Sequence, residues 1–466
     1  MSRDDATTNE RDESPDFDAP AADETPAVVA ARSADGPPDV TEIRALAAAA
    51  GYAVVGSVTQ RREEDPTYDL GRGKAEELMR LAAETDAEAV IYDGSLSPGQ
   101  TFSLGDLLPT GTAVIDRPRL VLELFADAAD SRAADRQLEL ARLRYELPRL
   151  REAVARDSGE DVRLQPEGDS RVLDVEKRIE SAERALDEIS DDRAARRAER
   201  RDAGFDLVAL AGYTNAGKST LARRLADDVA DAEPADAPTD LAAALSVDDR
   251  PFETLSTTTR RATLGGRRTL LTDTVGFLDG LPHESVRSFR TTIEAIRRAD
   301  CALLVVDASD DPDAIRRKLR ASLTAIEATD GPVIPVLSKT DAGDADDLAA
   351  AVEAYEAAVA DLDPRDAPVV DSLVAPIPVS ARDESGLADL AEAVADALPT
   401  ATATVEASNG GGAQAALSWA YDRGVVADVD YGGETVAVDL AGRPDVVAEA
   451  ERRLTGAVGE AGDGGE

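Results

Sequence analysis

The sequence predicts an α/β protein of several domains, and its length and two kinds of periodicity carry that prediction. The chain has 466 residues, enough for about three domains of ordinary size. In two stretches, 40–130 and 204–400, short apolar runs alternate with helical patterns, which is typical of mainly parallel sheets covered by helices. Between these stretches, apolar residues recur every three or four positions. We therefore expect two α/β domains joined by an antiparallel helical hairpin.

The chain is strongly acidic. Its 94 Asp and Glu against 51 Lys and Arg give a net charge of −43. Five of the basic residues are lysines: Lys74, Lys177, Lys218, Lys318 and Lys339. This composition is typical of cytosolic proteins of salt-loving organisms, in which net charge maintains solubility. At about 1 M salt the Debye length is roughly 3 Å, so the acidity does not exclude a nucleic-acid partner.

Nothing in the sequence predicts secretion or membrane insertion. The N-terminus is acidic where a signal peptide would be apolar, and no stretch of about 18 uncharged apolar residues occurs. The single cysteine, Cys301, cannot form an internal disulfide, which agrees with a reducing compartment. We expect a monomeric cytoplasmic protein without a membrane span.

The N-terminal part divides into a tail and a first domain. Residues 1–39 are rich in Asp, Glu, Pro and Ala and are expected to form a disordered acidic tail. Residues 40–130 are expected to form a small α/β domain. Its strands are predicted at Tyr52–Val58, Ala89–Tyr92 and Thr112–Ile115, and its helices at Val40–Ala50, Lys74–Ala83 and Gln100–Leu108.

Residues 131–203 are expected to form the helical hairpin. Apolar side chains recur on both sides of a polar loop, Asp157–Ser170, and Pro148 should kink the first helix. The second helix ends in the densest positive cluster of the chain, which consists of Arg193, Arg196, Arg197, Arg200 and Arg201. These arginines either stabilise the helix end or contact RNA phosphates.

Residues 204–400 are expected to form a doubly wound domain that binds its ligand at the carboxyl ends of the strands. Its strands are predicted at Leu207–Ala211, Arg260–Leu264, Thr269–Asp273, Ala302–Asp307, Val333–Ser338 and Ile377–Ser380. Residues 226–245 are expected to be a surface insertion. Residues 401–466 are expected to form a small C-terminal α/β domain, with a helix near Gln414–Asp422 and strands at Val425–Asp430 and Thr435–Asp439.

One motif of the doubly wound domain has a specific chemistry. A complete GxxxxGK[ST] pattern follows the first strand and precedes a helical pattern. It consists of Gly212, Tyr213, Thr214, Asn215, Ala216, Gly217, Lys218 and Ser219, followed by Thr220. The glycines let backbone N–H groups surround phosphate oxygens, Lys218 places a charge on the β and γ phosphates, and the Ser219 hydroxyl binds Mg²⁺. The sequence therefore predicts a nucleoside triphosphate site.

A second motif lies at the end of the third predicted strand and contains Asp273, Thr274, Val275 and Gly276. Asp273 is expected to reach Mg²⁺ through water, and the Gly276 N–H to meet the γ phosphate. Upstream, one of the three threonines at 257–259 is expected to close over Mg²⁺. The alternative is that all three only lead into a strand.

Two motifs at the ends of the fifth and sixth strands favour guanine. The first contains Ser338, Lys339 and Asp341, and the second contains Ser380, Ala381 and Arg382. The Asp341 carboxylate can accept hydrogen bonds from the N1–H and N2–H₂ edge of guanine, which adenine does not offer. The Ala381 N–H can meet guanine O6. Together the motifs predict a GTPase that binds GTP and GDP with Mg²⁺.

At this point the residues resemble the HflX-type ribosome-associated GTPases over about 50–400. The most specific segments are GYTNAGKSTL at Gly212–Leu221 and DTVGFLDGLPHE at Asp273–Glu284. DLGRGKAEEL at Asp69–Leu78, IDRPRLVLELF at Ile115–Phe125 and ELARLRYELPRL at Glu139–Leu150 are similar to the N-terminal and helical parts of that family.

The resemblance implies a translational GTPase that binds the large ribosomal subunit and its rRNA and separates stalled or idle ribosomes. It implies that Lys218 and Ser219 bind phosphate and Mg²⁺, that Thr258 belongs to the first switch, and that Asp273 and Gly276 belong to the second. The catalytic residues that it implies are Lys218, Thr258 and Gly276. The metal ligands that it implies are Ser219, Thr258 and Asp273. Asn215 occupies the position where some related GTPases hold K⁺, although it could equally be a turn residue.

The sequence departs from the family at three places. Ser338 stands where asparagine is usual, the loop Asp157–Ser170 lacks a run of glycines, and the insertion precedes the first switch. Phe277 also stands where Ras-like enzymes have the glutamine that positions water, so slow intrinsic hydrolysis is expected. The only histidine, His283, is expected to be structural. Two alternatives stay open: a GTPase that acts on another RNA or an RNA-modifying partner, and a nucleotide-gated scaffold with little hydrolysis.

Overall fold

The computed structural model divides the chain into two compact units, which we describe separately. One unit comprises Met1–Leu124 with Pro148–Pro166, and the other comprises Phe125–Leu147 with Glu167–Glu466. The structure describes residues 24–34, 36–127, 132–157, 169–226, 258–274, 276–277, 290–326, 328–365, 367–370 and 373–460. In these ranges no helix has the length and apolar character needed to cross a membrane.

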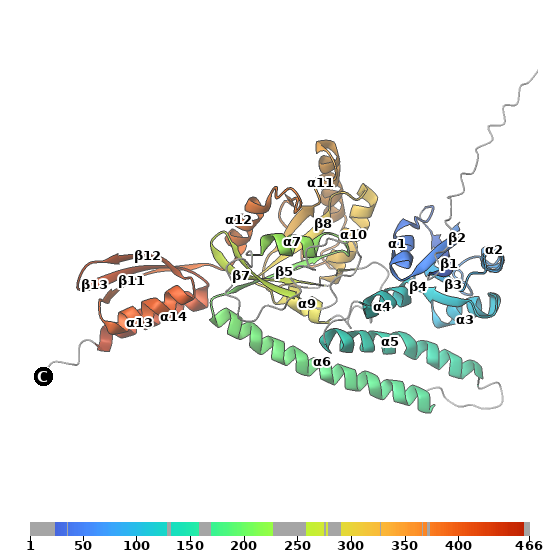
Figure 1. Ribbon diagram of the computed structural model, residues 1–466, viewed down its shortest axis with the longest axis horizontal. Helices are drawn as coiled ribbons and strands as arrows, with labels where there is room; N and C mark the ends of the chain where they lie inside the picture. Colours follow the sequence, from blue (N-terminus) through green and yellow to red (C-terminus); the bar gives the residue numbers. More distant parts are fainter. Residues whose placement is uncertain are drawn as a thin grey trace, which may run out of the picture. The chain divides into compact units, whose positions relative to one another are not determined.

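The first unit contains a four-stranded parallel sheet in the order β2-β1-β3-β4 (Figure 1). The strands are β1 (Thr25–Ser33), β2 (Tyr52–Arg61), β3 (Ala89–Asp93) and β4 (Ala113–Asp116). The helices are α1 (Thr41–Ala49), α2 (Arg72–Glu84), α3 (Pro98–Leu107) and most of α4 (Arg117–Asp127). The alternation of apolar runs and helices therefore folds as a parallel α/β layer, as predicted.

The expectation that residues 1–39 are disordered is wrong for Thr25–Ser33. This segment forms β1, an internal strand of the sheet, and Ala27–Ala31 are at most 1% exposed. Five consecutive apolar residues are the signal of a strand buried on both faces, and the acidic composition around them obscured it. Residues 1–23 of the expected tail lie outside the described part of the chain.

Two long helices occupy the expected hairpin, α5 (Arg132–Asp157) and α6 (Ser170–Asp202). The part of α5 before Pro148 runs antiparallel to α6 and packs on it through Leu140, Ala182 and Leu186 (Figure 1). Arg144 of α5 also donates to Glu183 of α6 at 2.6 Å. Helical structure continues through Pro148. Most of the loop expected between the helices lies outside the described residues.

The second unit contains a six-stranded sheet in the order β10-β9-β8-β5-β7-β6, which is parallel except for β6. The strands are β5 (Asp206–Gly212), β6 (Thr258–Leu264), β7 (Arg267–Asp273), β8 (Cys301–Asp307), β9 (Val333–Ser338) and β10 (Ile377–Pro378). Each coincides with a predicted strand to within three residues. Every residue of β5, β8 and β9 is buried, because helices cover both faces of the sheet.

Each face of this sheet has its own core, which confirms the doubly wound α/β class. One core receives side chains from α7 (Lys218–Leu225) and α12 (Leu387–Ala397). The other receives side chains from α9 (Arg290–Arg297), α10 (Pro312–Ala325) and α11 (Ala345–Ala360). Of the insertion expected at 226–245, only Ala226 lies within the described residues.

The C-terminal part is an antiparallel sheet of three strands covered by two helices. Its strands follow the order β11-β13-β12. Its elements are β11 (Ala401–Ser408), α13 (Gly411–Asp422), β12 (Val426–Tyr431), β13 (Thr435–Gly442) and α14 (Pro444–Glu460). The strand β11 and the helix α14 were not predicted. β11 buries only Val405 and Ala407, so its apolar signal is weak. The boundaries that we expect at 130, 203 and 400 stay predictions.

Candidate functional site

The site begins where β5 ends and α7 starts. The connecting loop reverses direction through three residues with positive φ: Gly212 at 139°, Asn215 at 63° and Gly217 at 87°. A side chain at Gly212 would place a Cβ 2.2 Å from the Val305 carbonyl oxygen of β8. Glycine is therefore required for the loop to leave the sheet at this point. Gly217 caps α7, so the N-terminus of that helix faces the loop, an arrangement that binds anions.

Lys218 is the first residue of α7 and is 6% exposed. Its Nζ donates a hydrogen bond to the Tyr213 carbonyl oxygen at 2.7 Å, across the loop. Burial lowers the pKa of Lys218 to about 8, and the nearby Asp273 carboxylate opposes that shift. The loop therefore holds a desolvated ammonium that an anionic ligand would stabilise.

The segment after β7 is hydrogen-bonded to this loop. The Phe277 N–H donates to Gly212 O at 3.0 Å, and the Thr214 N–H donates to Phe277 O at 2.9 Å. Gly276 lies so close that a Cβ on it would be 2.6 Å from the Thr214 Cα. The Thr274 hydroxyl donates to Leu210 O at 2.5 Å. The second predicted motif is thus in contact with the first. Val275 lies outside the described residues.

Residues whose side chains could hold Mg²⁺ lie close to Lys218 along the strands and helix of this edge. Asp273 ends β7 and is 4% exposed, and its negative charge opposes the lowering, by burial, of the pKa of the nearby Lys218. Thr258 begins β6 directly opposite Asp273 in the antiparallel ladder, and Ser219 lies in the first turn of α7. The Asp273 carboxylate and the Ser219 hydroxyl are hard oxygen donors, and Mg²⁺ prefers such donors together with phosphate oxygens and water. The residues present therefore fit this ion. The side chain of Thr258, and all of Thr257, lie outside the described residues.

The two guanine motifs meet at the carboxyl ends of β9 and β10. The Ser380 hydroxyl donates to Asp341 Oδ1 at 2.6 Å, which orients the carboxylate. Arg382 Nη1 lies 3.9 Å from Asp341 Oδ2 and is mostly exposed. Lys339 has a φ of 58°, and its Nζ lies 2.9 Å from Asp307 Oδ2. The Asp341 carboxylate therefore lies beside the Ser380–Arg382 turn, as the sequence predicts.

Ser338 has a role that the sequence did not reveal. Its hydroxyl donates to the Ala216 carbonyl oxygen of the first motif at 2.7 Å and lies 3.1 Å from Val306 O. The side chain is buried, so this hydrogen bond is shielded from water. Although Ser338 stands where asparagine is usual, its hydroxyl connects β9 to the phosphate-side loop.

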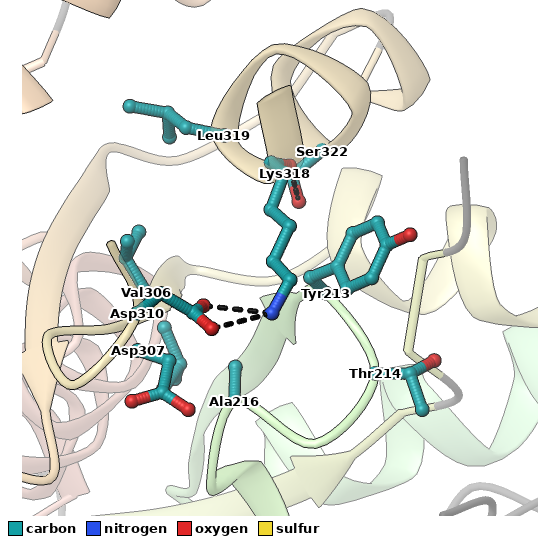
Figure 2. Close-up of a pocket in the computed structure, with 10 residues that line it drawn as sticks. Tyr213, Thr214, Ala216, Val306, Asp307, Asp310, Lys318, Leu319 and Ser322 are labelled. Carbon is teal, nitrogen blue, oxygen red and sulfur yellow. Dashed lines mark hydrogen bonds and ion pairs between the residues drawn. The ribbon is translucent and has the colours of Figure 1, made fainter. Parts of the chain in front are cut away.

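Three further residues next to the site were missed: Asp307, Asp310 and Lys318. Asp307 ends β8, Asp310 lies in the following loop, and Lys318 lies on α10. They line a pocket with Tyr213, Thr214 and Ala216 (Figure 2). The available signal was the rarity of lysine, because three of the five lysines of the chain, Lys218, Lys318 and Lys339, lie at this edge of the sheet.

The arginine cluster at the end of α6 is partly explained by contacts within its own unit. Arg197 donates to Glu294 of α9 at 2.7 Å, and Arg201 donates to Asp300 at 2.9 Å. These two arginines therefore fasten α6 to the six-stranded sheet. Arg200 lines a separate pocket. The side chains of Arg193 and Arg196, and all of His283, lie outside the described residues.

Together, the doubly wound sheet and the loops at its carboxyl edge define a P-loop nucleotide hydrolase. A family profile described as "50S ribosome-binding GTPase" matches residues 207–339, and one described as "GTP-binding GTPase N-terminal" matches residues 38–126. The protein "GTPase HflX" of Thermofilum pendens is 35% identical over 419 residues, which cover 88% of this chain and 92% of that protein. The chain belongs to the HflX family of GTPases, and it is a GTP-hydrolysing enzyme.

Two other relatives agree with this assignment. The "GTPase HflX" of Thermococcus kodakarensis is 41% identical over 308 residues, which cover 64% of this chain and 66% of that protein. That of Hyperthermus butylicus is 33% identical over 364 residues, which cover 76% and 90%. A crystal structure of a GTP-binding protein from Sulfolobus solfataricus in complex with GDP aligns with a TM-score of 0.40 at 22% identity, over 80% of this chain and 98% of that one.

Proposed function

We propose that this GTPase is a cytoplasmic, monomeric factor that binds the large ribosomal subunit and its rRNA and acts in ribosome splitting, rescue or recycling. The ribosomal partner is inferred from the family whose profile matches 207–339. The choice of guanine is supported by one observation, the position of Asp341 beside the Ser380–Arg382 turn, on the same sheet edge as the phosphate loop.

In this proposal, backbone N–H groups and side chains of four motifs bind the nucleotide. The residues are Gly212, Tyr213, Thr214, Asn215, Ala216, Gly217, Lys218, Ser219, Thr220, Asp273, Thr274, Val275, Gly276, Ser338, Lys339, Asp341, Ser380, Ala381 and Arg382. The Ser380 hydroxyl occupies one lone pair of Asp341 Oδ1, which leaves Oδ2 to accept from the guanine edge. Lys218 exchanges its bond to Tyr213 O for phosphate oxygens, which stabilise the ammonium that burial disfavours.

Hydrolysis then rests on positioning and on neutralisation of charge by Lys218, Thr258 and Gly276, without a covalent intermediate. Mg²⁺, held by Ser219, Thr258 and Asp273, would neutralise charge on the β and γ phosphate oxygens. Phe277 is 9% exposed and packs in the core that contains α10 and α11. It cannot orient an attacking water, so we propose that the ribosome, or K⁺ bound beside Asn215, accelerates the reaction.

The switch follows from the same contacts. Phe277 is hydrogen-bonded to the phosphate loop, Gly276 lies against Thr214 of that loop, and Thr258 is paired with Asp273. A γ phosphate at this site therefore orders both segments, and its loss on hydrolysis releases them. We propose that the ordered arrangement binds the ribosome and that hydrolysis ends the interaction.

The test is to pellet large ribosomal subunits in molar KCl with a non-hydrolysable GTP analogue, with GDP and with the corresponding adenosine analogue. We expect co-pelleting with the GTP analogue alone and, in a parallel assay, faster GTP hydrolysis as subunits are added. Binding to free transfer RNA but not to subunits would favour the RNA-modification alternative. The buried Phe277 favours the scaffold alternative, which predicts GTP-dependent pelleting without any acceleration of hydrolysis.

A further inference from the structure

The loop that follows β8 connects the phosphate side of the site to its guanine side. Asp307, the last residue of β8, and Asp310, in the loop, are three residues apart. Asp307 Oδ2 lies 2.9 Å from the Nζ of Lys339, which belongs to the guanine motif. Asp307 Oδ1 accepts hydrogen bonds from the N–H and the hydroxyl of Ser309, so the carboxylate is held from both sides.

Asp310 binds the second lysine of this region. The Nζ of Lys318 lies 2.7 Å from Asp310 Oδ1 and 2.8 Å from Asp310 Oδ2, and both side chains are only about one fifth exposed, at 21% and 19%. Burial raises the pKa of Asp310, and the Lys318 ammonium counteracts this effect. The pair is thus partly desolvated, and removing one partner would leave the other with a buried, uncompensated charge.

The same ammonium contacts the phosphate loop from behind. The Nζ of Lys318 lies 5.5 Å from the centre of the Tyr213 ring, within the range of a cation–π interaction. Figure 2 shows Lys318 reaching from α10 between Asp310 and Tyr213, above Ala216. The pocket that these side chains line has free space of about 10 Å³, room for about one water molecule. The side chains of the phosphate loop and of α10 therefore lie close together here.

We propose that Asp310 and Lys318 are positioning residues for the nucleotide. The pair holds the Tyr213 side of the phosphate loop against α10, and through Asp307 and Lys339 the same β8–α10 loop holds the guanine motif. The distance between the two halves of the site is thereby set before the ligand arrives. This inference rests on the proposed nucleotide-binding residues and adds two residues that lie outside the four motifs.

The experiment compares GDP binding and GTP hydrolysis by the full chain and its variants Lys318→Met, Asp310→Asn and the double variant. Lys177→Met is the matched control, since Lys177 is exposed on α6. We expect each single variant to raise the Kd for GDP and the KM for GTP about tenfold and to change kcat less than threefold, because binding is weakened equally in the ground and transition states. The double variant should resemble the single variants, and the control should match the native chain.

The proposal is overturned if folded Lys318→Met and Asp310→Asn bind GDP within twofold of the native chain. It is also overturned if the double variant shows the product of the two single losses, because the residues then act independently. If Lys318→Met does not fold, Asp310→Asn decides alone by the same measure. Failure of the native chain to bind GDP in preference to ADP would instead contradict the proposed guanine site.

Discussion

The two ends of strand β5 contain buried charges that are used in opposite ways. At its start, Asp206 accepts from Arg267 and Arg443, with nitrogen–oxygen distances of 2.8 and 3.2 Å. The neighbouring Asp300 accepts from Arg443 at 2.7 Å and from Arg201 at 2.9 Å. Three guanidinium groups thus compensate two carboxylates, and they come from α6, from β7 and from the turn before α14.

At the other end of β5 the arrangement is incomplete by itself. Lys218 donates to a neutral carbonyl oxygen, and its pKa is lowered by burial. Three residues of the loop have positive φ. The comparison shows two uses of buried charge. Ion pairs whose partners all belong to the chain hold its helices and strands together, whereas a buried charge whose best partner is a ligand forms part of a binding site.

Replacing Lys218 should have the largest effect on function. We expect Lys218→Ala to weaken GDP and GTP binding about 1000-fold, roughly 4 kcal/mol, because a buried cation that pairs with phosphate is lost. The apo protein should keep its stability or gain some, since a desolvation cost is removed. Isothermal titration and urea unfolding measure both quantities, with Lys177→Ala as control. Nucleotide binding close to that of the native chain would contradict the proposed role of the loop.

Replacing Arg443 should have the opposite signature. We expect Arg443→Met to lower the free energy of unfolding by about 3 to 4 kcal/mol, because Asp206 and Asp300 lose a shared buried partner. The Kd for GDP should not change. Arg452→Met is the control: Arg452 pairs with Glu449 but its side chain is 74% exposed, so the loss should stay below about 0.5 kcal/mol. Equal losses of unfolding free energy in the two variants would contradict a larger contribution of the buried ion pairs.

The pH dependence of stability should also differ between the ends. The pKa of Lys218 is about 8 in the folded chain and 10.5 in the unfolded chain, so between these values the unfolded state binds more protons. Stability contributed by this group therefore rises with pH across that window, by on the order of 3 kcal/mol. Urea unfolding of the apo protein at pH 7.5 and at higher pH, with Lys218→Met as reference, isolates this contribution. A difference that does not vary with pH would contradict it.

Replacing Ser338 should have the smallest effect. Ser338→Ala removes the hydroxyl that donates to Ala216 O, and we expect a cost of about 1 kcal/mol, or roughly a fivefold increase in the Kd for GDP. Ser408→Ala, at an exposed position on β11, is the control for loss of a hydroxyl. Stopped-flow dissociation of a fluorescent GDP analogue would detect the change. A larger loss of stability than of affinity would assign Ser338 to packing alone.

The phosphate loop, the DTVG segment and the guanine motifs could be located from the sequence because each is a short pattern whose chemistry depends on neighbours in the chain. The central strands β5, β8 and β9 could be predicted because parallel strands buried on both faces are nearly continuous apolar runs. β1 was missed because its apolar run lies in an acidic context. β11 was missed because Val405 and Ala407 are its only buried residues, so its apolar pattern is short.

The sequence by itself determined where the candidate nucleotide-binding residues lie in the chain, because backbone turns, helix starts and strand ends are encoded locally. Only the tertiary structure decided which distant polar groups meet. The Ser338 hydroxyl reaches Ala216 O across 122 positions, and Arg443 reaches Asp206 across 237. Such pairs depend on how strands are ordered in a sheet and on which helices cover it, and no spacing along the chain specifies them.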